Sequence, residues 1–190
     1  MKASYKLKDV ATVLMGYNAR TQVEESEEGS TDLLQMKDLT SEVLDKMPAL
    51  TRFELETRST RFLIQAGDIV IRTRGKSFGC TYIQSEPERP TVPAAPLMII
   101  RVNEGAPVQP AYLSWLLNQP GCQSVLQHAA KKSTAIPMIN GQTIADLDLL
   151  VHPFEEQAAI AQIANLSLEL KQLSCELAEK KHQLIIATLN

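Results

Sequence analysis

Hydrophobic residues recur at helical spacing along the last part of the chain, which carries the strongest pattern in the sequence. Between residues 153 and 190 there is no glycine, and no proline follows Pro153. Isoleucine and leucine recur at steps of three and four residues, the heptad spacing of a coiled-coil seam. The seam consists of Ile163, Leu166, Leu170, Leu173, Leu177 and Leu184. Because such a stripe is unfavourable in water, we expect one long helix, beginning at Phe154 or Glu155, that packs against another helix.

Two further features of this helix leave alternatives open. Lys180 stands where the heptad calls for an apolar residue, so it either fixes the register or marks the end of the pairing. A second stripe of smaller residues lies roughly opposite the seam: Ala161, Ala164, Leu168, Cys175, Ala178, Ile185 and Leu189. That stripe packs either against the rest of the same chain or against a second protein.

The preceding residues show short apolar runs separated by turns. We expect a helical turn entering a strand at 5–14, strands at 33–36, 69–73, 81–83, 97–102 and 144–151, helices at 110–117 and 123–130, and loops at 18–32, 85–96 and 131–140. Strands and helices in this order predict an α+β or α/β globular domain over residues 1–150, followed by one coiled-coil-forming helix over residues 151–190.

Composition and charge narrow the function only slightly. The chain has a formal net charge of -3, which argues mildly against nucleic acid as a partner, and aromatic residues make up 5%. So few aromatics argue against a stacking platform for single strands. The charge is uneven, since residues 52–101 hold eight basic and five acidic side chains, a net +3. Local sign matters more than the total for docking a polyanion.

Several classes of site are missing from the sequence. The three cysteines stand far apart with no CxxC or HxxxH spacing, so we expect neither a structural metal nor a disulfide framework. No P-loop, GxSxG, HExxH or methyltransferase motif is present, so we expect no catalytic residue and no cofactor. The N-terminus lacks a signal-peptide core and no stretch reaches membrane-span length, which favours the cytoplasm and no membrane contact.

The first candidate binding residues follow an apolar strand. Along residues 69–76, Arg72, Arg74 and Lys76 are expected on one strand face, opposite Ile69, Ile71 and Thr73. Cations on one face, with Ser77 beside them, suit phosphate contact, and arginine also reads guanine. The alternative is an ordinary solvated strand face. In the turn before this strand, Gly67 and Asp68 are expected to have a structural role.

Two polar loops supply further candidates. Lys131, Lys132, Ser133 and Thr134 follow a helix, where they suit either phosphate binding or a simple match to the helix dipole. The other loop holds Tyr17, Asn18, Arg20, Thr21 and Gln22, of which Asn18 and Gln22 are suited to adenine edges. Arg58 and Arg61 are weaker candidates.

The order of these pieces resembles a known family. The relevant segments are GDIVIRTRG (67–75), PAYLSWLLN (110–118), KKSTAIPMI (131–139), IADLDLLV (144–151) and HPFEEQAAIAQI (152–163). Together they resemble the target-recognition domain and following spacer helix of the specificity (S) subunits of type I restriction–modification enzymes. The most specific piece is the helix opening with Pro153, Glu156-Gln157 and Ile160.

The resemblance implies sequence-specific binding of double-stranded DNA by a non-catalytic subunit that positions methyltransferase (modification) and restriction subunits. Such subunits usually carry two recognition domains and two spacer helices, whereas this chain has one of each. We therefore expect a half-subunit or a fragment, forming a homodimer through its helix. The competing interpretation is a structural coiled-coil dimer that binds protein and not DNA.

Overall fold

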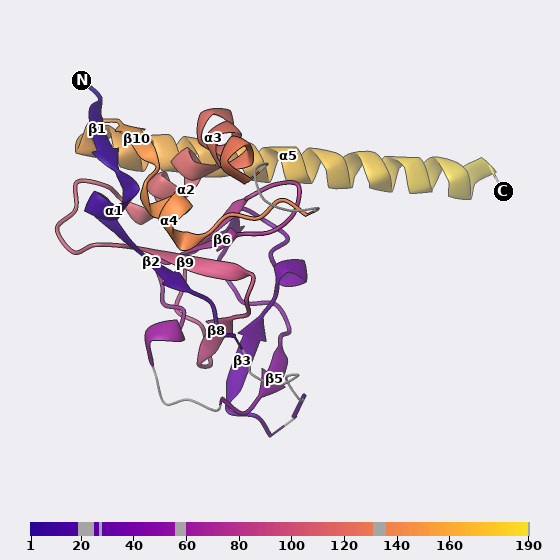
Figure 1. Cartoon of the computed structure of the whole chain (residues 1–190). Helices are drawn as coiled ribbons and strands as arrows, with labels where there is room; N and C mark the ends of the chain where they lie inside the picture. Colours follow the sequence, from indigo (N-terminus) through magenta and orange to yellow (C-terminus); the bar gives the residue numbers. More distant parts are fainter. Residues whose placement is uncertain (19–24, 27, 56–59, 131–135, 190) are drawn as a thin grey trace.

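The structure, a computed structural model, describes residues 1–18, 25–26, 28–55, 60–130 and 136–189. It has three layers and one projection (Figure 1). Helices lie over one side of a central sheet, a smaller sheet lies on the other side, and the C-terminal helix runs across the helical layer and continues beyond it.

The central sheet has five strands in the order β2-β9-β6-β7-β4. Neighbouring strands are antiparallel except for the parallel pair β4–β7. The strands are β2 (Ala11–Met15), β9 (Leu97–Val102), β6 (Ile69–Arg72), β7 (Cys80–Ile83) and β4 (Val43–Leu44). In β6, Ile69 and Ile71 enter the core under the helices, while Val70 enters the core on the opposite face. Both faces of this strand are therefore buried, which explains its unbroken apolar run.

The helical layer covers one face of the central sheet. It consists of α1 (Leu7–Val10), α2 (Pro110–Asn118), α3 (Pro120–Ala130) and α4 (Gly141–Ala145). Beside it, β1 (Ala3–Lys6) pairs antiparallel with β10 (Asp148–Val151) and joins the two ends of the domain. Tyr112, Leu113 and Leu117 of α2 are fully buried in the main core.

The smaller sheet forms the opposite end of the molecule. Its order is β5-β3-β8, with β5 (Thr51–Phe53), β3 (Thr31–Leu34) and β8 (Thr91–Pro93). Two short 3-10 turns, Met36–Asp38 and Thr60–Phe62, connect it to its surroundings. The ring of Tyr17 packs against Phe53 and Phe62, with centroid distances of 5.6 and 6.1 Å.

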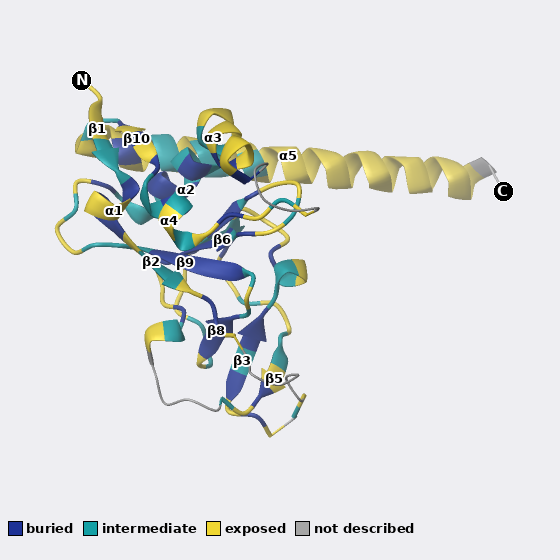
Figure 2. Cartoon of the chain, in the orientation of Figure 1, coloured by how far each residue is buried: buried dark blue, intermediate teal, exposed yellow. Residues whose placement is uncertain are grey.

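Helix α5 (Phe154–Leu189) begins at Phe154, as the sequence predicts. Glu155 and Glu156 lie in its first turn, where acidic side chains suit the helix dipole. Its first half is partly covered by the domain, whereas every residue from Glu169 to Thr188 is exposed. Figure 2 shows this change along the helix, from teal and blue to yellow.

Several predicted boundaries are wrong for local reasons. The helix predicted at 123–130 begins three residues earlier, because Pro120 stands at the first position of α3, where proline is favourable. Ile144 belongs to α4 and not to a strand, since the Asn140 side chain caps that helix by accepting from the Thr143 amide. Strand β8 lies inside the predicted 85–96 loop, and β3 begins inside the predicted 18–32 loop.

Candidate nucleic-acid interface

One edge of the central sheet gathers the ends of several strands. Met15 at the end of β2 pairs with Met98, and Arg72 at the end of β6 pairs with Leu97. The chain continues past this edge on both sides of the segment that precedes β9. The Gly16 amide donates to the Leu97 carbonyl at 3.0 Å, and the Thr73 amide donates to the Pro96 carbonyl at 3.0 Å. The segments holding Asn18 and Arg74, both exposed, therefore leave the sheet at the same edge.

The turn after β6 also lies beside the segment that precedes α4. The Gly75 amide donates to the Pro137 carbonyl at 3.0 Å, and the Ile139 amide donates to the Thr73 carbonyl at 2.9 Å. Between them Arg74 and Met138 form an antiparallel bridge. Gly75 has a φ of 117°, a conformation that favours glycine. The turn with Arg74 thus lies beside residues 137–139. The predicted cluster Lys131, Lys132, Ser133 and Thr134 precedes these residues in the sequence and falls outside the described residues.

Arg72 does not share a strand face with Arg74 and Lys76, as the alternation had predicted. Strand β6 ends at Arg72, and the two later residues belong to the turn. The Arg72 side chain is half-buried, and its Nη2 donates to the backbone carbonyl of Leu39. A DNA contact by Arg72 stays a prediction, and the structure gives this guanidinium an internal partner.

Other arginines of the basic region also have partners inside the domain. Arg89 Nη2 donates to the Gly29 carbonyl at 2.6 Å, and its Nε lies 3.4 Å from Asp32 Oδ1. By contrast, Arg74, Lys76 and Ser77 are exposed. Exposed side chains remain able to bind an external anion, so these three stay the strongest of the predicted contacts. Arg20 and Arg58 lie outside the described residues.

Arg61, a weak candidate from the sequence, is placed better by the structure. Its guanidinium carbon lies 4.7 Å from the centre of the Phe62 ring, and its side chain is exposed. Phe62 in turn packs against Tyr17, one residue before Asn18. The local sequence does not indicate that Arg61 and Asn18 lie near each other, because their segments are far apart in the chain and meet through the packing of Phe62 on Tyr17.

The Gly67-Asp68 turn has the structural role that the sequence predicts. Gly67 adopts a φ of 89°, and Asp68 is 1% exposed. Asp68 accepts from the Gln65 amide at 2.8 Å and from Nε and Nη2 of Arg101 at 2.7 Å each. The side-chain hydrogen bonds with Asp68 raise the pKa of the Arg101 guanidinium.

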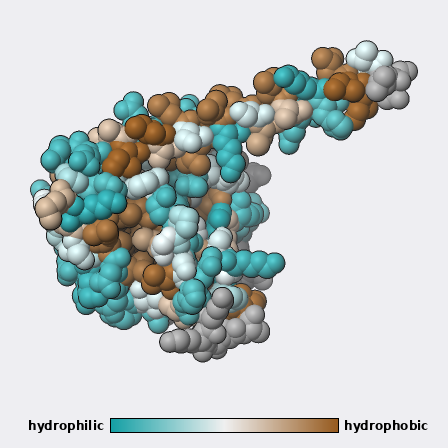
Figure 3. All heavy atoms as spheres, turned by 90° about the horizontal axis from the view of Figure 1, so that it is seen from above, coloured by the Kyte–Doolittle hydropathy of each residue, from teal (hydrophilic) through white to brown (hydrophobic). Residues whose placement is uncertain are grey.

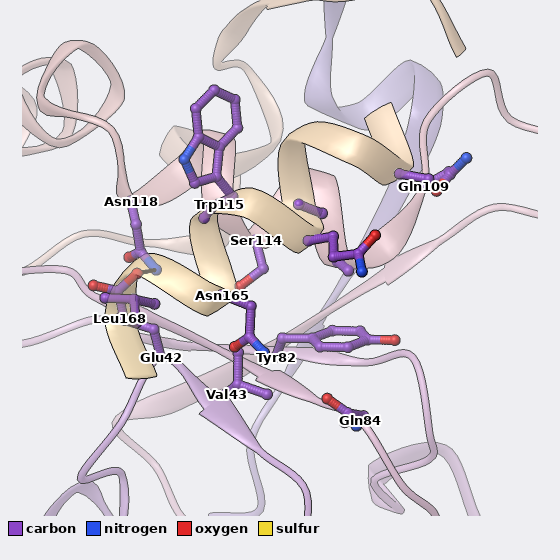
Figure 4. Close-up of a pocket in the computed structure, with 15 residues that line it drawn as sticks. Glu42, Val43, Tyr82, Gln84, Gln109, Ser114, Trp115, Asn118, Asn165 and Leu168 are labelled. Carbon is purple, nitrogen blue, oxygen red and sulfur yellow. Dashed lines mark hydrogen bonds between the residues drawn. The ribbon is translucent and has the colours of Figure 1, made fainter. Parts of the chain in front are cut away.

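Helix α5 offers a second candidate surface. The six seam residues are 54–68% exposed, although they are apolar. Figure 3, seen from above, shows hydrophobic side chains in brown along the projecting part of the helix. On the domain side, Ala161, Ala164 and Leu168 are half-buried and line a cavity of about 320 Å³ beside Trp115 and Tyr82 (Figure 4). The first half of the second stripe therefore faces its own domain. This agrees with the interpretation that the stripe packs against the rest of the same chain.

Comparison with known proteins gives one kind of match. No family model matches the chain, and no curated protein matches its sequence. Solved structures do match. The HsdS subunit from Thermoanaerobacter tengcongensis has a TM-score of 0.64 over 93% of this chain at 13% identity. A second structure comes from work on the complex assembly and conformational transition of the type I R-M system. It has a TM-score of 0.67 over 96% of this chain at 15% identity. The type I restriction–modification S subunit from M. genitalium has a TM-score of 0.56 over 94% at 16% identity.

The chain has the fold of type I specificity subunits. It spans 39%, 43% and 42% of the length of these three solved chains. The match covers the globular domain and a long C-terminal helix together. At such low identities the shared property is the fold, and no residue role is transferred by the match itself.

Other kinds of site receive no support from the part of the chain that the structure describes. No cluster of three or more histidine, cysteine or acidic side chains is arranged to hold a metal ion there. Within the same residues, no helix combines the length and the apolar character needed to span a bilayer. Cys80 is buried, which raises the pKa of its thiol and makes it a poor nucleophile.

Proposed function

We propose that this chain is the DNA-recognition part of a type I restriction–modification specificity subunit. In this function it binds duplex DNA at a specific sequence and catalyses no reaction itself. The observation that carries the proposal is the fold match over 93–96% of the chain, which includes both the recognition domain and the long helix. The exposed cations at one sheet edge and the exposed helix seam support the two parts of this function separately.

The DNA contacts are proposed for the sheet edge described above. Arg74, Lys76 and Ser77 would hold phosphates or guanine edges, and Asn18 is suited to an adenine edge. Arg20 and the cluster Lys131–Thr134, outside the described residues, complete the proposed set. Arg61 joins it, because its exposed guanidinium lies near Tyr17 through Phe62.

Helix α5 is proposed to pair antiparallel with the same helix of a second copy, which makes the assembly a homodimer. Its 36 residues extend about 54 Å at 1.5 Å per residue. The two recognition domains would lie at opposite ends of that rod and read two half-sites of an inverted repeat. Methyltransferase subunits are the proposed partners for the remaining apolar surface of the helices.

The net charge of -3 shapes the expected affinity. DNA binding depends on neutralising phosphates, so a chain with a net negative charge should bind weakly alone. We propose that methyltransferase subunits supply much of the positive potential, and that the assembled complex binds tightly.

The test is selection from a randomised duplex DNA library, with the chain alone and with a type I modification subunit. An enriched inverted repeat with a fixed gap is expected from the complex. Changing Arg74 and Lys76 together to alanine should weaken binding by roughly tenfold or more, since each phosphate or base contact contributes about 1 kcal/mol or more. Lys46→Ala is the matched control, because Lys46 is an exposed lysine that follows β4, at the other end of the strands from Arg74.

Three results would each contradict a part of the proposal. Recovery of no sequence by the complex would leave the protein-binding coiled-coil module as the better interpretation. Equal loss of affinity in Lys46→Ala and in the double variant would remove the sheet edge as the DNA contact. Tight, site-specific binding by the chain alone would contradict the need for the methyltransferase subunit.

A further inference from the structure

The first turns of α5 contain a buried polar residue that joins three segments. Gln157 is 0% exposed, although glutamine is usually a surface residue. Its Oε1 accepts from the Gln109 amide at 2.8 Å, and its Nε2 donates to the carbonyls of Pro107 and His152 at 2.9 and 3.0 Å. One side chain therefore ties α5 to the start of α2 and to the end of β10.

A second set of bonds surrounds the same point. The Tyr112 hydroxyl lies 2.7 Å from Nδ1 of His152 and accepts from the His152 amide at 3.0 Å. The Gln109 side chain donates to the carbonyl of Phe154 at 3.4 Å. All these groups lie within the first turn of α5 or in the residues that face it, so they form a polar joint at the base of the helix.

Beyond this joint α5 is held less closely. Ile160 and Ala161 are half-buried against the main core, and Leu168 is half-buried beside a cavity of about 320 Å³ that is lined by this part of the helix, β4, β7 and α2 (Figure 4). A gap that contains no side chain gives no directional restraint, because dispersion contacts are lost across it. The hydrogen bonds at Gln157 are directional and buried, so they restrain the angle of the helix more strongly.

The length of α5 turns a small angular change into a large displacement. His182 lies 25 residues beyond Gln157, or about 38 Å along the helix. A rotation of about 10° at the joint would move His182 by about 7 Å for a helix of this length. The direction of the projecting half is therefore set near its base.

We propose that Gln157 is the positioning residue that fixes the angle at which α5 leaves the recognition domain. Its amide suits this role because it donates twice and accepts once, matching three backbone groups from the segment before α2 and the residue after β10. In the assembly the same angle fixes the gap between the two DNA half-sites. This second step rests on the proposed function. The glutamine in the opening of the helix then has a physical role that its sequence pattern alone does not reveal.

The experiment measures a distance within one chain. Cysteines introduced by Glu104→Cys and His182→Cys, both exposed positions, carry spin labels, with Cys122 and Cys175 changed to serine and labelled chains diluted in unlabelled ones. We expect Gln157→Leu to shift the mean label distance by several ångströms or to broaden its distribution about twofold, from the lever above. Gln162→Leu makes the same change at an exposed position of the same helix and should leave the distribution unaltered.

An unchanged distance and width in folded Gln157→Leu would overturn the proposal. If that variant does not fold, Gln157→Asn, which is too short to reach its partners, and Tyr112→Phe decide in its place by the same criterion. DNA selection with the same variants tests the assembly separately. A changed distance with an unchanged half-site gap would overturn the link to spacing and leave the joint standing, whereas a complex of the unchanged chain with the modification subunit that selects no DNA would contradict only the proposed function.

Discussion

The two halves of α5 carry similar apolar stripes but have different surroundings. In the inner half, Gln157 is buried and Ile160, Ala164 and Leu168 are half-buried against the domain. In the outer half, from Glu169 to Thr188, all side chains are exposed, including Leu173 at 63% and Leu184 at 68%. The inner half of the helix therefore buries apolar side chains on the face that contacts the domain. The described residues of the outer half are buried on no face.

This difference shows why the outer half can be helical and still need a partner. Starting a helix is the costly step, and the inner half, fixed by the joint at Gln157, supplies an existing nucleus for the outer turns. Continued helix does not bury the seam, however, because no other part of the described chain covers it. An exposed apolar stripe of this length indicates an interaction surface.

The largest expected effect comes from breaking the seam. Changing Leu170 and Leu173 together to aspartate removes four leucines from a two-helix pair, at about 1.5–3 kcal/mol each, so pairing should weaken by 10⁴-fold or more, by order of magnitude. Light scattering should give about 42 kDa for the unchanged chain, twice its 21.0 kDa, and about 21 kDa for the variant.

Lys171→Asp is the control, because it introduces the same charge at an exposed position between the two leucines and off the seam. A mass near 21 kDa for both the unchanged chain and the variant would show that a second copy does not cover the outer half. The prediction of a palindromic DNA site would then be withdrawn.

The second expected effect concerns the domain that anchors the inner half. Asp68→Asn removes the charge from a pair in which Asp68 is 1% exposed, so the free energy of unfolding should fall by about 3 kcal/mol. Urea unfolding measured by Trp115 fluorescence reports this. Asp148→Asn breaks the exposed Lys6–Asp148 pair and should cost less than about 1 kcal/mol. Equal losses in both variants would remove the special role of the buried turn.

The sequence predicted the elements whose signals are local. Helix α2 begins at Pro110 and α5 at Phe154, as predicted, because proline placement and helical periodicity are read within one segment. Strands β1 and β8 were missed, since they are defined by partners far away in the chain. Strand β1 pairs with β10 near residue 150, and β8 holds Pro93 at the end of its pairing with β3.

The candidate site was predictable as residue types but not as an arrangement. Arg74 and Lys76 were proposed from charge and spacing, and both are exposed. No local pattern indicated that Arg72 turns inward to Leu39, or that residues 73–75 lie beside residues 137–139. The role of Gln157 was hidden as well, because a glutamine in an amphipathic helix is ordinarily assigned to its solvent face.

The smallest expected effect distinguishes the two faces of the outer half. Cys175 is exposed and belongs to the stripe opposite the seam, whereas burial raises the pKa of Cys122 and of Cys80. Because the thiolate is the reactive form, a maleimide at neutral pH should label Cys175 first, Cys122 slowly and Cys80 only after unfolding.

Pairing through the seam leaves the opposite face open, so the rate of Cys175 labelling should change less than about twofold between the unchanged chain and the double leucine variant. Protection of Cys175 by tenfold or more in the unchanged chain alone would show that a second copy covers this stripe too. Protection that appears only when a modification subunit is added would instead assign the stripe to that subunit, and the two apolar faces of α5 would then have different partners.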